Sequence, residues 1–239
     1  MDDRFIPFIH NYCDRWCDRC PLTARCRVAE AEKTDASVGH DTDNETFWRR
    51  IAASFAEAQM MLAGKAEELG IDLGVVTDEE FARFQEFEDD FIENHGLTKL
   101  AQTYVKESRR ALDEASDWLL FAPLDETEQS EMLEVVRWYH FFIAAKIGRG
   151  LMGILDFEGG LDEEQLADAQ SDANGSIKIA LIAVERSQRA WAALTAPENA
   201  DRLEPLVRLL ENVKKTAETQ FPHARDFLRP GFDEFEPVM

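Results

Sequence analysis

The chain has 239 residues, a formal net charge of −22 and 45% hydrophobic residues. This apolar content is enough to build a core, so the composition excludes a disordered chain. A surface this negative repels phosphate backbones and anionic lipid, which argues against nucleic-acid partners and against peripheral membrane binding.

The first residues, Met-Asp-Asp-Arg, lack the basic start and apolar core of a secretory signal. The longest apolar stretch, residues 138–157, is interrupted by His140, Lys146 and Arg149. These polar side chains favour a buried helix over a membrane span. We therefore expect a cytoplasmic protein, in which a reducing environment disfavours structural disulfides.

The four cysteines lie within fourteen residues, arranged as Cys13-x3-Cys17-x2-Cys20-Pro-x4-Cys26. Four thiolates complete a coordination shell for zinc or for an iron–sulfur cluster. A dense run of cysteines, with proline after one of them, is typical of cluster ligation. Zinc more often takes two Cys-x2-Cys pairs separated by a longer loop. The spacing therefore predicts a metal centre that holds a [4Fe–4S] cluster, with Zn²⁺ as the alternative.

Arginine is concentrated around these cysteines, although the chain as a whole is acidic. The residues concerned are Arg15, Arg19, Arg25 and Arg27. Nearby cations stabilise the negative charge of four metal-bound thiolates, whereas salt bridges to the acidic bundle are the alternative interpretation. Tyr12 and Trp16 flank the first cysteines and either screen a cluster from water or pack the arm onto the bundle.

Over eight residues, the spacing of Cys13, Cys17 and Cys20 resembles the cysteine triplet of radical enzymes that use S-adenosylmethionine. The resemblance implies strands that alternate with helices and an iron that no cysteine binds. This chain has Arg19 where that family has an aromatic residue, shows no strand pattern, and offers Cys26 as a fourth ligand. We therefore do not assign the chain to that family.

Residues 29–44 are polar and weakly patterned, which predicts a linker or an irregular arm. From residue 44 onward, apolar residues recur every three or four positions, a spacing typical of helices. Capping signals, glycines and prolines delimit these helices. They are expected at residues 44–70, 77–96, 97–121, 125–155, 162–169, 174–195 and 201–220.

Strand alternation is absent, so the sequence predicts an all-α protein. Residues 1–43 are expected to form a short Cys-rich metal-binding arm with its linker, and residues 44–239 an acidic multi-helix bundle. The bundle ends in a tail rich in proline and phenylalanine. We expect Phe227, Phe232 and Phe235 to dock on the bundle, because three exposed phenylalanines would leave an unfavourable apolar surface.

Charged residues also lie among the apolar ones in two expected helices, near residues 131–155 and 174–195. Arg137 shares a helical stripe with His140, and Lys146 lies on a second stripe; Lys178 and Glu185 lie along the other helix. Buried polar groups need partners. These side chains therefore either pair between helices or converge on an anionic ligand, in which case the pocket residues are His140, Lys146, Lys178 and Glu185. A di-iron centre would need Glu-x-x-His pairs, and the sequence has none.

These features lead to three hypotheses of function. The first is a cluster-dependent protein that acts in electron transfer or redox sensing, with a redox or protein partner. The second is an interaction module stapled by zinc and without catalysis. The third is an enzyme that uses the anion pocket between the two helices. The sequence leaves the oligomeric state open.

Overall fold

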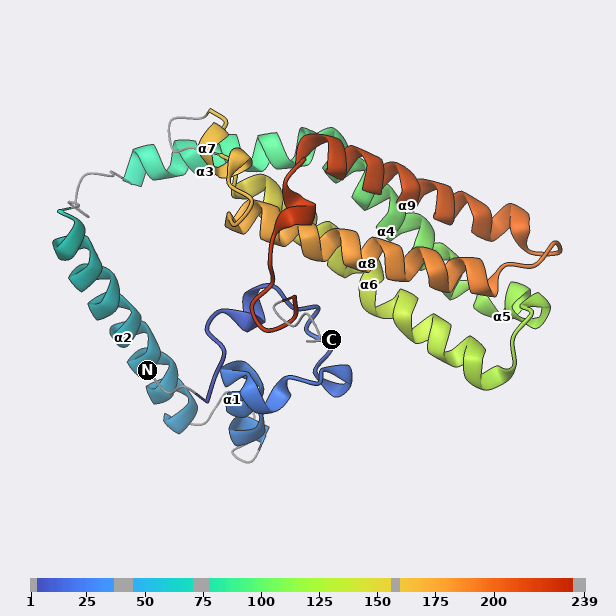
Figure 1. Cartoon of the computed structure of the whole chain (residues 1–239), viewed down its shortest axis with the longest axis horizontal. Coiled ribbons are helices and arrows are strands. Elements are labelled where there is room, and N and C mark those ends of the chain that lie inside the picture. The colour runs from blue at the N-terminus through green and yellow to red at the C-terminus, as the bar shows by residue number, and fades with distance from the viewer. Residues whose placement is uncertain (1–3, 37–44, 71–77, 156–159, 234–239) are drawn as a thin grey trace, which may run out of the picture. The chain divides into compact units, whose positions relative to one another are not determined.

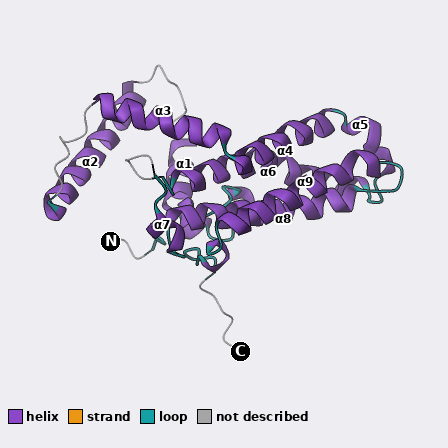
Figure 2. Cartoon of the chain, turned by 90° about the horizontal axis from the view of Figure 1, so that it is seen from above, coloured by secondary structure: helices purple, strands orange, loops and turns teal. Residues whose placement is uncertain are grey.

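The computed structural model describes residues 4–36, 45–70, 78–155 and 160–233. In these residues every regular element is a helix (Figure 2), and the one pairing of extended backbone is an isolated bridge between Leu155 and Leu161. The prediction of an all-α protein is confirmed. Among the helices of these ranges, none is both long and apolar enough to cross a membrane.

The chain divides into two compact units. Unit 1 contains Met1–Ile6 and Cys17–Gln85, and unit 2 contains Pro7–Trp16 and Glu86–Met239. The predicted domains, residues 1–43 and 44–239, have a different boundary and stay a prediction.

Unit 1 is built from helices of very different length. They are η2 (Cys17–Arg19), η3 (Thr23–Arg25), α1 (Arg27–Ala36), α2 (Glu45–Leu69) and the first part of α3 (Asp78–Asn94). The prediction of an irregular segment is wrong for residues 29–36, which are helical. Ala, Glu and Lys fill this segment and are strong helix formers, although they give little amphipathic pattern. The rest of that predicted segment, residues 37–44, lies outside the described residues.

Unit 2 contains four long helices that run side by side in Figure 1. They are α4 (Gly96–Asp113), α6 (Glu126–Met152), α8 (Asp172–Leu194) and α9 (Ala200–Gln220). Helix α6 packs against α4 and α8, and α9 packs against the same two helices. The four helices therefore close into a bundle, as the sequence predicts.

Short elements complete this unit. They are η1 (Ile9–Asn11), α5 (Ala115–Trp118), η4 (Leu119–Phe121), α7 (Glu163–Ala167) and η5 (Ala224–Asp226). The helix expected over residues 97–121 is broken after Asp113. Its second part turns so that Trp118 is buried and its indole Nε1 donates to the carbonyl oxygen of Ala111 at 2.8 Å. The burial of this large side chain thus overrides the continuous helical pattern.

Helix α8 lies close to α6 because Gly150 of α6 and Gly153, which caps the C-terminal end of α6, face it. A Cβ atom at Gly150 would lie 2.7 Å from the side chain of Ile177, and one at Gly153 would lie 3.2 Å from that of Ala173. Normal carbon–carbon contacts are about 3.5–4.0 Å. Glycine at these two positions therefore permits the close packing of the two helices.

The C-terminal segment packs on the bundle, as the sequence predicts. Phe221 and Phe227 are buried, with 1% and 3% of their surface exposed, and Phe232 is half-buried. Phe235 lies outside the described residues. Docking of the tail is therefore confirmed for Phe227.

Candidate metal centre

Cys13 lies in a short loop of unit 2 that begins with η1. Its thiol contacts the carbonyl oxygen of His10 at 3.6 Å. Phe8 and Arg15, on either side, both have a φ angle of 58°. This left-handed conformation is uncommon for residues other than glycine. The loop keeps this backbone conformation because its contacts to the bundle hold it in place.

Asp14, next to Cys13, is the main polar anchor of this loop. Its carboxylate Oδ2 accepts a hydrogen bond from the Tyr139 hydroxyl at 2.7 Å and another from the Arg186 guanidinium, which also donates to the Tyr139 oxygen. Its backbone oxygen accepts from Trp138 Nε1 at 2.9 Å. The aspartate is therefore bonded to both α6 and α8.

Aromatic packing supports the same anchor. Trp16 is buried and stacks on Trp138, with ring centroids 5.1 Å apart and an angle of 16° between the planes. The centroids of the Trp16 and Tyr139 rings lie 5.8 Å apart, and the rings are close to perpendicular. Burial, and then the hydrogen bond to Asp14, raise the pKa of Tyr139. The phenol therefore keeps the proton that it donates to the aspartate.

Tyr12 provides a second anchor on the other side of Cys13. Its hydroxyl donates to Asp172 at 2.9 Å, and Arg149 binds the same carboxylate through two hydrogen bonds of 2.8 and 3.0 Å. The Tyr12 ring lies 4.5 Å from that of Phe227 and packs over Gly175. Burial, and then the bond to Asp172, raise the pKa of Tyr12 to about 12. The loop, α8 and the C-terminal segment thus meet at this tyrosine.

Lys146 of α6, one of the predicted pocket residues, also binds the loop. Its ammonium group donates to the carbonyl oxygen of Asn11 at 2.9 Å. Burial, and then the charge of Arg149, lower the pKa of Lys146, whereas Cys13 acts in the opposite direction. His140 lies apart from this lysine, with its Nδ1 atom 2.7 Å from the carbonyl oxygen of Arg137.

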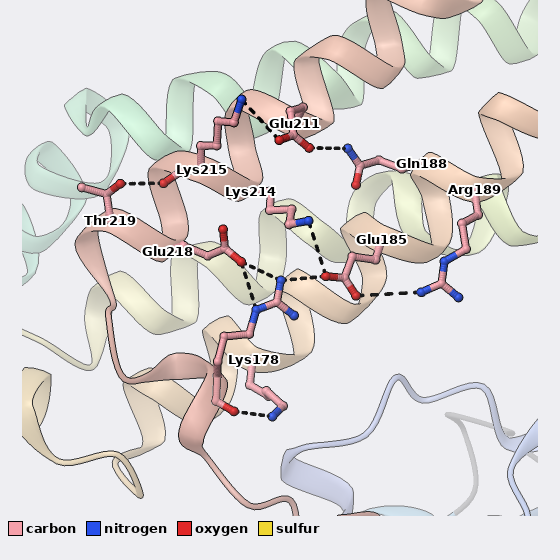
Figure 3. A network of polar contacts seen from close by, with 10 residues as sticks. Lys178, Glu185, Gln188, Arg189, Glu211, Lys214, Lys215, Glu218 and Thr219 are labelled. Atoms are coloured by element: carbon pink, nitrogen blue, oxygen red, sulfur yellow. Dashed lines mark hydrogen bonds and ion pairs between the residues drawn. The ribbon is translucent and has the colours of Figure 1, made fainter.

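The other two predicted pocket residues meet at Arg225 in η5 (Figure 3). Lys178 donates to the backbone oxygen of Arg225 at 2.6 Å, and the guanidinium of Arg225 donates to Glu185 and Glu218 at 2.7 Å each. Lys214 adds an ion pair with Glu185 at 3.7 Å. The structure thus brings Lys178 and Glu185 together through structural pairing, while Lys146 and His140 have other partners. The anion pocket stays a prediction.

Two cavities of unit 2 lie along α9. One, of about 350 Å³, is lined by Ala192, Thr195, Glu204, Val207 and Arg208. The other, of about 480 Å³, is lined by Glu107, Arg110, Ala111, Glu114, Asp201, Arg202, Pro205, Leu206 and Leu209. None of the predicted pocket residues lines either cavity.

The other three cysteines lie in unit 1 on tight turns. The backbone N–H of Cys20 donates to the oxygen of Cys17 at 3.1 Å, and that of Cys26 donates to Thr23 at 3.3 Å. The carbonyl oxygen of Cys26 then accepts from Glu30 at 3.1 Å as α1 begins. All four cysteines of the chain are partly exposed and form no disulfide.

As placed, no group of three or more His, Cys, Asp or Glu side chains within the described ranges could hold a metal ion. The four-cysteine centre and its occupant therefore stay predictions.

The anchors of the loop were missed by the sequence analysis, because no local pattern points from Asp14 to Arg186 or from Tyr12 to Asp172. Tyr12 and Trp16 beside the cysteines were the available signal.

The described residues define a helical-bundle protein in which a loop around Cys13 is anchored to α6 and α8. Comparison with protein-family models, with curated proteins and with solved structures found no significant match to this chain.

Proposed function

We propose that Cys13, Cys17, Cys20 and Cys26 bind one [4Fe–4S] cluster, which the protein uses for electron transfer or redox sensing. The observation that carries this proposal is the presence of four thiols within fourteen residues, all partly exposed and none in a disulfide. Buried single cysteines often act as small apolar residues, but clustered and accessible thiols are suited to metal ligation. A reducing compartment such as the cytoplasm keeps these thiols available.

The charges around Cys13 support an anionic centre. Four thiolates around a cluster carry net negative charge, which nearby cations stabilise. In unit 2, Lys146 binds the loop two residues before Cys13, and its charge interacts with that thiol. Arg15 contributes a further cation to this electrostatic environment. These positive charges gather in a chain whose net charge is −22.

The anchors of the loop support a defined position for Cys13. Tyr12 and Asp14, the residues on either side, each bind carboxylate, guanidinium or phenol groups of α6 and α8. Groups that hold the neighbours of a ligand orient it and tune the metal. The same four thiolates also suit tetrahedral Zn²⁺. Zinc would make the segment a folded interaction module in place of a redox centre.

Four single Cys→Ser variants test this proposal, with Asp18→Ser as the matched control. Asp18 is exposed and lies between two of the cysteines, in η2. Protein purified without oxygen should be brown and absorb at about 400 nm, as thiolate-bound clusters do. Each Cys→Ser variant should lose this absorption, and the control should keep it. A colourless wild-type protein, or cysteine variants that keep the colour, would contradict the proposal.

A further inference from the structure

The chain passes from α3 into α4 through a single residue. Helix α3 ends at Asn94 and α4 begins at Gly96, so His95 alone joins them, and this joint lies within unit 2. The φ and ψ angles of His95 are −64° and 136°, which is extended backbone. The first N–H groups of a helix have no partner inside that helix. They need a partner from the residue that precedes it, or water.

The imidazole of His95 supplies one such partner. Its Nδ1 atom accepts a hydrogen bond from the backbone N–H of Leu97 at 3.3 Å, so His95 is the N-cap of α4. The usual N-cap residues are serine, threonine, aspartate and asparagine, and none of these changes its charge between pH 5 and pH 8. Histidine does. A ring nitrogen accepts a hydrogen bond only while it carries no proton.

We propose that His95 makes the joint between α3 and α4 sensitive to pH. The neutral imidazole caps α4, whereas the protonated imidazole releases the N–H of Leu97 and the first turn of α4 opens. Leu97 is fully buried, so its freed N–H reaches water only when this turn opens. Protonation also places a positive charge at the positive end of the helix dipole. Both effects oppose the closed joint.

The surroundings of His95 favour the neutral form. Its ring lies 5.2 Å from that of Phe91, which packs against the core of the bundle. Burial lowers the pKa of His95 below its usual value of 6.5. The cap is therefore complete at neutral pH. Its contribution to stability is lost as the pH falls below about 6.5 and through the folded pKa of His95, because the unfolded chain then binds more protons.

Charged groups near the joint do not control this titration. On α3 and α4, Asp90 and Lys99 both bond to the side chain of Asn94, at 2.9 and 3.2 Å, and Glu93 is exposed. Helices α6 and α9 pack against α4, and the charged groups in their last turns form the pairs Arg149–Asp172 and Glu218–Arg225. Among the described residues, none of these charges contributes to the lowered pKa of His95, whose cause is burial.

Amide hydrogen exchange of the full chain tests the joint. After correction for the intrinsic exchange rate, the protection factor of the Leu97 N–H should fall about fivefold between pH 7.5 and pH 5, as expected for the loss of an N-cap. The N–H of Asn174 is the internal control, because Ser171 caps α8 through a hydroxyl at 3.2 Å. This hydroxyl does not titrate in that range, so the protection of Asn174 should stay the same.

Two variants assign the effect to His95. His95→Asn keeps a good N-cap that does not titrate, so it should remove the pH dependence of Leu97 protection. His140→Asn is the matched control and should keep it: His140 is also partly exposed, but its Nδ1 atom lies 2.7 Å from the carbonyl oxygen of Arg137.

Titration of the wild-type imidazoles by nuclear magnetic resonance provides a measurement that needs no variant. It should give a pKa below 6.5 for His95. A pKa at or above 6.5 would overturn the proposal. Equal protection of Leu97 at the two pH values, or a pH dependence that survives in His95→Asn, would overturn it as well.

Discussion

Gly175 in α8 allows two aromatic rings from opposite ends of the chain to reach the helix. A Cβ atom at this position would lie 2.5 Å from Cε1 of Tyr12 and 2.7 Å from two ring atoms of Phe227. Gly175→Ala therefore forces both rings to move by about 1 Å, because carbon atoms normally pack at about 3.5–4.0 Å. The perturbation acts on the loop beside Cys13 and on the C-terminal segment together.

Two opposing effects set the size of the change. Alanine is favoured over glycine in a helix by about 0.5–1 kcal/mol. Overpacking of a well-packed site costs about 1–3 kcal/mol, and displacement of Tyr12 also weakens its hydrogen bond to Asp172, a contact worth about 1 kcal/mol. The packing effect is larger. We expect Gly175→Ala to destabilise the protein by about 1–3 kcal/mol.

Gly148→Ala is the control, since a Cβ atom there would meet nothing within 4 Å. It should stabilise the protein by about 0.5–1 kcal/mol through helix propensity alone. In a thermal melt, 1 kcal/mol corresponds to about 2–4 °C for a chain of this size. The melting temperature should therefore fall for Gly175→Ala and rise for Gly148→Ala. Equal stabilisation by both variants would refute the packing of Tyr12 and Phe227 over Gly175.

Three further predictions concern other contacts of unit 2. Arg186→Met should lower the free energy of unfolding in urea by about 1–3 kcal/mol, because it removes the charged hydrogen bond to Asp14 of the loop. Arg189→Met is its control, because it removes an exposed ion pair of 3.9 Å with Glu185. It should change the free energy of unfolding by less than about 0.5 kcal/mol. Equal losses in the two variants would contradict the anchor. Phe227→Ala should cost about 3–5 kcal/mol in the same assay, since the ring is only 3% exposed; an unchanged midpoint would show that the tail does not pack. Burial raises the pKa of the Asp233 carboxyl, but the hydrogen bonds and charge of Arg229 outweigh it and lower the pKa below its usual value. The carboxylate thus stabilises the fold above about pH 4, and this stabilisation is lost as the pH falls through the folded pKa of Asp233. The free energy of unfolding of Asp233→Asn should therefore decrease less than that of the wild type between pH 5 and pH 2.

Local signals were enough to predict most of the helices. Asp125 and Glu128 form a capping box at the start of α6, where the sequence predicts a helix from residue 125. Gly70, which has a φ angle of 68°, follows the last residue of α2 as expected for a C-terminal glycine. Helix α1 was missed because its residues favour helix without forming an apolar stripe.

The position of the Cys13 loop could not be predicted from the sequence. Its anchors join residues that are 160 and 172 positions apart, Tyr12 with Asp172 and Asp14 with Arg186. Charged residues on a helix are usually exposed, so the sequence does not distinguish Arg186 from its neighbour Arg189. Lys146 was predicted as a pocket residue, and sequence spacing could not show that it binds the backbone of Asn11. The four-cysteine centre, in contrast, is predicted from its spacing alone and stays a prediction.

Metal and sulfide analysis of wild-type protein purified without oxygen is the most direct test of the proposed centre. Iron, zinc and acid-labile sulfide are measured per chain on the same sample. The account predicts about four iron and about four sulfide per chain. One zinc per chain without iron would contradict the redox function and favour the interaction module. Protein that contains neither metal, even after reconstitution with iron and sulfide, would contradict the four-cysteine centre itself.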